Sequence, residues 1–129
     1  MVIPLKTIRH IKLQYNRLVN LQLGGNQMLV CQSYDRRVYL FDIRRECFED
    51  VFAYHPEVKL CTAASKIITL PNGMVWIVGT NGDLWRIDCF RYKDKGGLVY
   101  LPAHSDAERK RYVFTVSLDM QGNEWVLTD

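Results

Sequence analysis

The sequence predicts an all-β fold of repeated, four-stranded antiparallel units. One unit recurs three times, at residues 23–30, 70–80 and 118–128, and each copy joins an apolar stretch to a turn rich in Gly and Asn. When the copies are aligned on Gly25, Gly73 and Gly122, they lie 48 and 49 residues apart. Short strands repeated at this period are typical of β-propeller blades. The chain holds about two and a half such units, so we expect a partial β-propeller that cannot close a ring alone.

Residues 1–17 are ambiguous, because alternation at Ile11, Leu13 and Tyr15 favours a strand while a wider spacing of apolar residues also fits a helical face. We interpret them as an incomplete strand or linker from a preceding blade. Blade 1 covers 18–58. Its predicted strands are Leu18–Leu23, Met28–Gln32, Val38–Ile43 and Cys47–Tyr54, with a turn at Gly24–Asn26, where Gly and Asn adopt positive φ at little cost.

Blade 2 covers 59–108, and its Asn81-Gly82 pair is a strong hairpin signal. Its predicted strands are Lys66–Leu70, Val75–Thr80, Asp83–Asp88 and Gly97–Leu101. Residues 109–129 provide the first half of a truncated blade 3, with strands Tyr112–Leu118 and Glu124–Thr128. We therefore expect the exposed edges of this piece to associate with other copies or with the remaining blades of a longer chain.

Composition excludes several classes of function. The net charge is only +3, and the basic clusters alternate with acids, which favours solvated loops over a nucleic-acid surface. No run is long enough to span a membrane, and the start lacks the pattern of a signal peptide. The four cysteines do not have zinc-site spacing. Cys31 and Cys89 fall in apolar strand patterns and are expected as buried thiols, although an even number of cysteines also permits disulfides.

The second and third copies resemble the blade repeat of two-component regulator propellers. That repeat has an Asp-x-x-Gly-Asn turn, a Trp-apolar-Gly-Thr strand and a Gly-containing hairpin. Residues 119–128 match at Asp, Gly, Asn, Trp and Thr, and residues 71–85 match at Gly, Trp, Gly-Thr and the following Asn-Gly. The first copy departs, with Met28 in place of Trp and Gln32 in place of Thr.

This resemblance implies the periplasmic sensor region of a hybrid histidine kinase from gut Bacteroides-type bacteria. Such regions detect oligosaccharides and signal to a cytoplasmic kinase, and only the parent chain would contact the inner membrane. The kinase motifs are not in these residues, so the fragment itself is expected not to be an enzyme and to need no cofactor or metal. We expect Trp76 and Trp125 to pack between blades, Gly73 and Gly122 to shape turns, and Asp119 to cap its turn.

Two motifs could suggest catalysis, but neither predicts it. The consecutive side chains of His104-Ser105-Asp106 diverge in a loop and do not form a triad. Residues 117–125 nearly match the Asp-box of sialidase-like propellers, which is a turn motif away from the active site. We therefore rank a propeller lyase or glycosidase below two other functions, the sensor and a scaffold for protein–protein interaction.

A binding face is expected on the loops that join strand two to strand three and strand four to the next blade. Tyr and Arg beside carboxylates suit sugar hydroxyls, through stacking and paired hydrogen bonds. The alternative is that this fragment carries no part of the parent's site. The candidate ligand-binding residues are Tyr34, Asp35, Arg36, Tyr54, His55, His104, Asp106 and Arg109.

Overall fold

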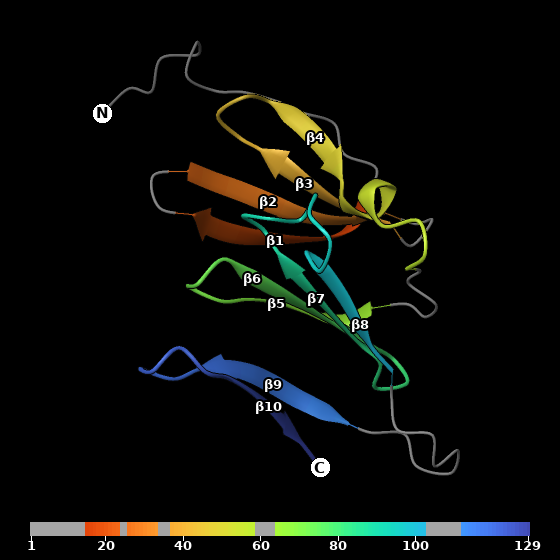
Figure 1. Cartoon of the computed structure of the whole chain (residues 1–129), viewed down its shortest axis with the longest axis vertical. Helices are drawn as coiled ribbons and strands as arrows, with labels where there is room; N and C mark the ends of the chain where they lie inside the picture. Colours follow the sequence, from red (N-terminus) through yellow and green to blue (C-terminus); the bar gives the residue numbers. More distant parts are fainter. Residues whose placement is uncertain (1–14, 24–25, 34–36, 59–63, 103–111) are drawn as a thin grey trace.

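The structure, a computed structural model, describes residues 15–23, 26–33, 37–58, 64–102 and 112–129 (Figure 1), with the first two strands described by their backbone alone. It confirms the all-β prediction, because every described strand lies in an antiparallel sheet. The first sheet contains β1 (Tyr15–Leu23), β2 (Asn26–Ser33), β3 (Val38–Asp42) and β4 (Cys47–Asp50). The second contains β5 (Ala64–Thr69), β6 (Met74–Gly79), β7 (Leu84–Asp88) and β8 (Leu98–Leu101). The third contains β9 (Val113–Leu118) and β10 (Glu124–Thr128).

The strands within each sheet follow chain order, and the three sheets are stacked face to face (Figure 1). The same irregularity interrupts the first hairpin of every sheet. The register shifts between Tyr15 and Arg17 in the first sheet and between Ala64 and Lys66 in the second. In the third sheet it shifts between Val113 and Thr115, the partners of Thr128 and Leu127. The first strands of successive sheets begin 49 residues apart. A β-bulge therefore recurs at the equivalent position of each first hairpin, so the three hairpins share one backbone geometry.

The turns also repeat. Gly73 and Gly122 have φ values of 83° and 88°, as predicted for residues that shape tight turns. Asp42 and Asp88 both end the third strand of their sheet, and each carboxylate accepts backbone N–H groups from the turn that follows, at 3.0 Å from Arg44 and 3.0 Å from Phe90. Each aspartate thereby fixes the exit from its strand.

The fourth predicted strand of the first sheet is shorter than expected. It ends at Asp50 and is followed by a 3-10 helix, η2 (Val51–Tyr54), so the prediction of a strand over Cys47–Tyr54 is wrong at its second half. The Asp50 carboxylate accepts the N–H of Phe52 at 3.0 Å, which turns the backbone into the helix. Consecutive residues Val51 and Phe52 are both buried, which a strand with one buried face does not allow.

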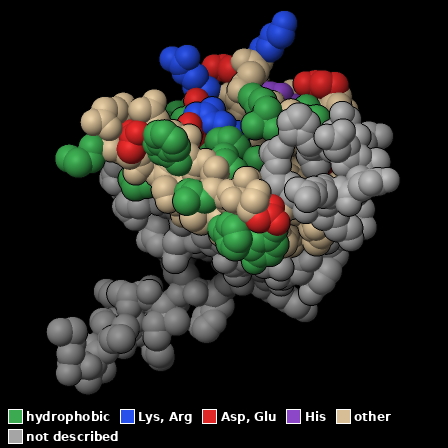
Figure 2. Space-filling model, turned by 90° about the horizontal axis from the view of Figure 1, so that it is seen from below, with side chains coloured by type: hydrophobic (Ala, Val, Ile, Leu, Met, Phe, Trp, Pro, Cys, Tyr) green, Lys and Arg blue, Asp and Glu red, His purple; other side chains and the backbone are tan. Residues whose placement is uncertain are grey.

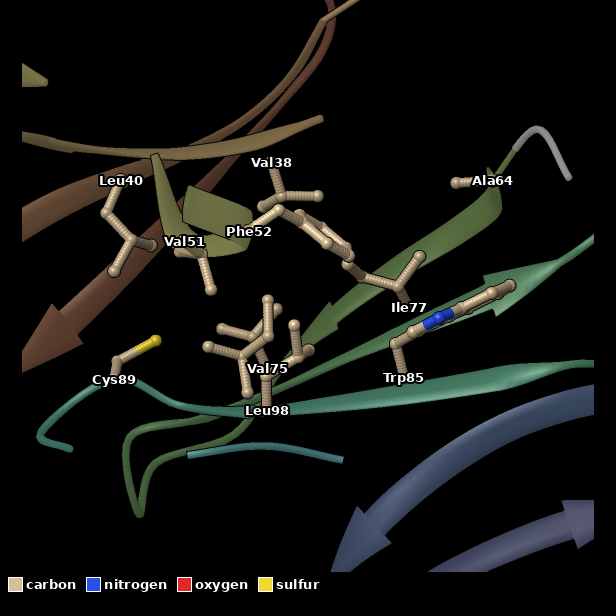
Figure 3. Close-up of a cluster of buried hydrophobic side chains, with 11 residues drawn as sticks. Val38, Leu40, Val51, Phe52, Ala64, Val75, Ile77, Trp85, Cys89 and Leu98 are labelled. Carbon is tan, nitrogen blue, oxygen red and sulfur yellow. The ribbon is translucent and has the colours of Figure 1, made fainter. Parts of the chain in front are cut away.

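The larger core fills the space between the first and second sheets (Figure 3). Val38 and Leu40 on β3 and the two buried residues of η2 face the second sheet. The second sheet contributes Val75, Ile77, Trp85, Ile87 and Leu98, and Trp85 is fully buried. Truncating one of the larger of these side chains to alanine would cost about 2–5 kcal/mol. This core therefore joins the two four-stranded sheets into one unit.

Cys89 lies in this core as a free thiol, as predicted; the side chain of Cys31 lies outside the described residues. Burial, with a smaller contribution from the charge of Asp88, raises the pKa of Cys89 to about 12. The thiol therefore stays protonated at neutral pH and is a poor nucleophile.

A second core joins the second and third sheets. Leu70, Trp76, Val78 and Leu84 pack against Val113 and Val116. Polar contacts stabilise the same interface. The Glu124 carboxylate accepts the Trp76 indole Nε1–H at 2.7 Å and also pairs with Arg86, with Glu124 Oε2 lying 2.7 Å from Arg86 Nη2. Trp76 is thus buried between two sheets, as predicted for it.

The matching prediction for Trp125 is wrong in this structure. Its side chain is 59% exposed, because among the described residues no further sheet packs on the outer face of β9 and β10. The indole Nε1–H instead donates to Asp119 at 2.8 Å. Asp119 caps its turn as expected, accepting the backbone N–H groups of Gln121 and Asn123 at 2.9 and 2.8 Å.

Candidate functional site

A group of aromatic and charged side chains lies where the end of η2 meets the loop between β7 and β8. The rings of Tyr54 and Tyr92 contact edge to face, with centroids 5.9 Å apart and an interplanar angle of 69°. The ammonium group of Lys93 lies 5.4 Å from the first centroid and 5.7 Å from the second. Glu49, on β4, adds a carboxylate. We call these four residues the tyrosine–lysine cluster; it joins elements that belong to two different sheets.

Hydrogen bonds and charge hold the cluster together. The Tyr54 hydroxyl donates to Glu49 Oε2 at 2.9 Å, and Lys93 Nζ lies 3.8 Å from Glu49 Oε1. The neighbouring phenols of Tyr92 and Tyr54, and then Glu49, raise the pKa of Lys93. Burial and the charge of Glu49 raise the pKa of Tyr92, although Lys93 opposes this. At neutral pH the raised pKa values therefore keep Lys93 a cation and Tyr92 a neutral phenol.

His55 lies beneath the cluster and holds its backbone in place. The ring is buried, and its Nε2–H donates to the carbonyl oxygen of Tyr92, while its Nδ1 lies 3.9 Å from a carboxylate oxygen of Glu57. Because a carbonyl oxygen only accepts, this contact fixes the tautomer in which Nε2 carries a proton. His55 therefore connects η2 to the β7–β8 loop.

The loop that carries Tyr92 and Lys93 is compact. Successive turns close it through hydrogen bonds from Arg91 N to Asp88 O at 3.1 Å, from Asp94 N to Arg91 O at 2.9 Å, and from Gly97 N to Asp94 O at 2.9 Å. A Cβ atom at Gly97 would lie 2.0 Å from the carbonyl oxygen of Arg91. Only glycine allows this approach, so Gly97 sets the path that brings Tyr92 to Tyr54.

The structure places two of the predicted ligand-binding residues. Tyr54 is exposed at the surface in the cluster, whereas His55 is buried and occupied by its bond to the loop, so its side chain is not open to a ligand. The other predicted residues, Tyr34, Asp35, Arg36, His104, Asp106 and Arg109, lie outside the described residues.

The sequence reasoning missed Tyr92 and Lys93. The segment around them appeared as a charged, solvated loop, and their distance from Tyr54 along the chain hid the contact. The signal that was available is the Gly96-Gly97 pair at the end of the same loop, which indicates a tight turn there.

The side chains of the cluster are suited to binding. The exposed ring of Tyr54 and the half-buried ring of Tyr92 offer apolar surface and hydroxyl groups. The Lys93 and Glu49 side chains can donate to and accept from hydroxyl groups of a ligand. Among the described residues, no group of three or more His, Cys, Asp or Glu side chains could hold a metal ion. In the same part of the chain, no helix has the length and apolar character that crossing a bilayer requires.

Comparison with known proteins identified no relative: no family model matches the chain, and no similar protein was found among curated proteins or solved structures.

Proposed function

We propose that the chain is part of the extracytoplasmic sensor propeller of a hybrid two-component histidine kinase, where it recognises an oligosaccharide and relays the signal. Its place would be the periplasm, and its parent chain would supply the membrane anchor and the kinase. The proposal starts from the resemblance of residues 71–85 and 119–128 to the two-component regulator propeller repeat.

The repeating sheets support the propeller part of this proposal. Three copies of one hairpin, bulged at the same position, stack face to face, and the first strands β1 and β5 of neighbouring sheets lie close together. In a propeller, the first strands of successive blades surround the central axis. We interpret the first and second sheets as whole blades and the third as half of one.

The tyrosine–lysine cluster is the single observation that carries the binding part. It is a pair of aromatic rings, one exposed and one half-buried, with a lysine and a glutamate beside them, and it is built by two sheets that the larger core fixes in place. Aromatic surface can stack on the apolar face of a sugar ring, while Lys93 and Glu49 bond its hydroxyl groups. Glu49 and Tyr54 belong to the first sheet and the helix that follows it, whereas Tyr92 belongs to the β7–β8 loop of the second sheet. A bound ligand would therefore bias how the two sheets pack.

The test is a titration of the purified chain with a panel of defined oligosaccharides, followed by calorimetry and by NMR shifts of Tyr54 and Tyr92. We expect one class of glycan to shift both rings. Tyr54→Ala and Tyr92→Ala should each weaken binding about two- to tenfold, because one aromatic contact is worth about 0.5–1.5 kcal/mol. Tyr92→Ala leaves intact the backbone carbonyl that His55 bonds.

Phe90→Ala is the matched control, because Phe90 is an exposed aromatic residue of the same loop. It should leave the affinity unchanged. The proposal fails if no oligosaccharide in the panel shifts the two tyrosines, or if Phe90→Ala weakens binding as much as the two tyrosine variants do.

A protein-binding scaffold is the second candidate function, and the outer face of the third sheet favours it. Phe114, Trp125 and Leu127 are all exposed there. Figure 2, which views the molecule from the side of this sheet, shows hydrophobic side chains exposed across the face. Contiguous exposed apolar surface is typical of interaction sites. Binding of a protein partner that is insensitive to the tyrosine variants would favour this candidate.

A further inference from the structure

Within the tyrosine–lysine cluster, the ammonium group of Lys93 lies in a corner between two aromatic rings. Its Nζ is 5.4 Å from the ring centroid of Tyr54 and 5.7 Å from that of Tyr92, inside the limit of about 6 Å at which a ring attracts a cation. The two rings stand at 69° to each other and form the walls of the corner. The Glu49 carboxylate lies 3.8 Å from Nζ, beyond hydrogen-bond distance, so it attracts the ammonium group through charge. We call Tyr54, Tyr92 and Glu49 the ammonium cage.

The cage is fixed by contacts that do not involve Lys93. The Tyr54 hydroxyl donates to Glu49 Oε2 at 2.9 Å, and the buried His55 bonds the backbone carbonyl of Tyr92. The Lys93 side chain, by contrast, is 54% exposed and has a flexible stem. Its ammonium group can therefore leave for water while the two rings and the carboxylate stay in place.

The charged state of Lys93 indicates what the cage attracts. The phenols of Tyr92 and Tyr54, and then Glu49, raise the pKa of Lys93, so these surroundings favour the ammonium ion over the neutral amine. A primary ammonium is strongly hydrated, and the water that it gives up offsets part of this attraction. A quaternary ammonium group carries the same charge, but its methyl groups cannot donate hydrogen bonds to water. It therefore loses less hydration in the cage, while the Lys93 that it displaces regains its own.

We propose that the ammonium cage binds a quaternary ammonium group, which displaces Lys93 into water. The ligand belongs to the chemical class of choline and the betaines, as a free solute or as a lipid headgroup. The ring faces and the Glu49 charge provide the affinity. Lys93 is an internal competitor that selects weakly hydrated cations over primary amines.

This inference goes beyond oligosaccharide recognition and does not depend on it. If no glycan in the panel binds, the cage can still bind choline. If choline does not bind, the oligosaccharide proposal still stands on its own test.

The experiment is an NMR titration of the full chain with choline, followed at the rings of Tyr54 and Tyr92. We expect both rings to shift, with a dissociation constant of about 1–10 mM, because each exposed cation–π contact is weak. Two control ligands separate charge from shape. The neutral analogue of choline, in which carbon replaces nitrogen, keeps the shape without the charge, and ethanolamine keeps the charge without the methyl groups. Each should bind at least about tenfold more weakly than choline.

Three protein variants test the roles within the cluster. Lys93→Ala removes the competitor and should tighten choline binding about three- to tenfold, a gain that misfolding cannot produce. Lys95→Ala is the matched control, because it removes the same charge from an exposed position of the same loop; affinity should change less than about twofold. Glu49→Gln keeps an acceptor for the Tyr54 hydroxyl but removes the charge, and should weaken choline binding about threefold or more.

A second titration, with phosphatidylcholine vesicles, identifies the source of the ligand. Binding of both free choline and vesicles would assign a lipid headgroup, and binding of free choline alone would assign a solute. The proposal is overturned if choline shifts neither ring, if the neutral analogue binds as tightly as choline, or if Lys93→Ala does not tighten choline binding. Vesicle binding without binding of free choline would also overturn it, because the ammonium group would then not be the part recognised.

Discussion

Replacing Glu124 with alanine tests how the third sheet is attached. The Glu124 carboxylate accepts the Trp76 indole N–H and pairs with Arg86 through Nε at 3.1 Å and Nη2 at 2.7 Å. Its side chain is only 14% exposed, and that of Arg86 is 28% exposed. The substitution therefore leaves a largely buried guanidinium and an indole N–H without their acceptor.

Removing one partner of a buried pair costs about 3–5 kcal/mol. Water can reach part of Arg86 and recover some of this loss, so we expect Glu124→Ala to lower the free energy of unfolding by about 2–3 kcal/mol. For a chain of this size, that corresponds to a fall in Tm of about 6–12 °C. Glu124→Gln keeps an acceptor for Trp76 and should lose about 1 kcal/mol.

The assay combines urea unfolding with hydrogen exchange. Because Glu124 acts between sheets, the amides of β9 and β10 should lose protection in Glu124→Ala while those of β5 to β7 keep theirs. In a double-mutant cycle, Arg86→Ala and Glu124→Ala should show a coupling of about 1–2 kcal/mol. A loss below about 0.5 kcal/mol for Glu124→Ala, or purely additive effects of the two substitutions, would refute this account of the interface.

The same carboxylate predicts a dependence on pH. Burial alone would raise the pKa of Glu124, but the hydrogen bonds from Arg86 and Trp76 and the charge of Arg86 outweigh it, so the pKa lies below its usual value. Its contribution is therefore fully present above the ordinary glutamate pKa of about 4.3 and is lost as the pH falls through the lowered value. The difference in the free energy of unfolding between the unmodified chain and Glu124→Gln should therefore shrink as the pH falls below about 4.3 and through the lowered pKa.

Three further predictions concern single residues. Gly97→Ala should displace the β7–β8 loop and abolish oligosaccharide binding, as NMR shifts of the loop would show; unchanged shifts would contradict the role given to this glycine. In mass-spectrometric mapping of thiol alkylation, the exposed Cys47 should react readily and Cys89 only on unfolding; equal rates would contradict the burial of Cys89. The Trp125 indole and turn N–H groups lower the pKa of Asp119 to about 2, so the bonded turn should persist at pH 4 and loosen as the pH falls toward 2; Trp125 fluorescence that changes above pH 4 would contradict this.

Much of the fold was predictable because local signals agree with one another. Alternating apolar residues and the turn glycines Gly73 and Gly122 locate the hairpins, and the period of the repeat fixes their order. The end of β4 was not predictable in the same way. Val51 and Phe52 suit a strand, and only the bond from Phe52 N to the Asp50 carboxylate turns them into a helix. Trp125 was misplaced because, among the described residues, no further sheet packs on its face of the third sheet.

The candidate site was harder to predict than the fold. Its contacts join Glu49 and Tyr54 to Tyr92 and Lys93, which are far apart in the sequence. No local sequence pattern predicts that these two segments contact each other. The contact between η2 and the β7–β8 loop depends on the buried His55 and on the close passage of Gly97 past Arg91. Loop positions can be selected from residue type, but which loops meet is decided by packing between sheets.

The central claim is that the sheets stack face to face, with the face of the second sheet that carries Trp76 packed on the third sheet. NMR distance contacts from the Trp76 indole test it most directly. The account predicts cross-peaks between this ring and the methyl groups of Val113 and Val116, and none from the Trp125 ring to the second sheet. A Trp76 ring with contacts only inside its own sheet would contradict the stacked arrangement.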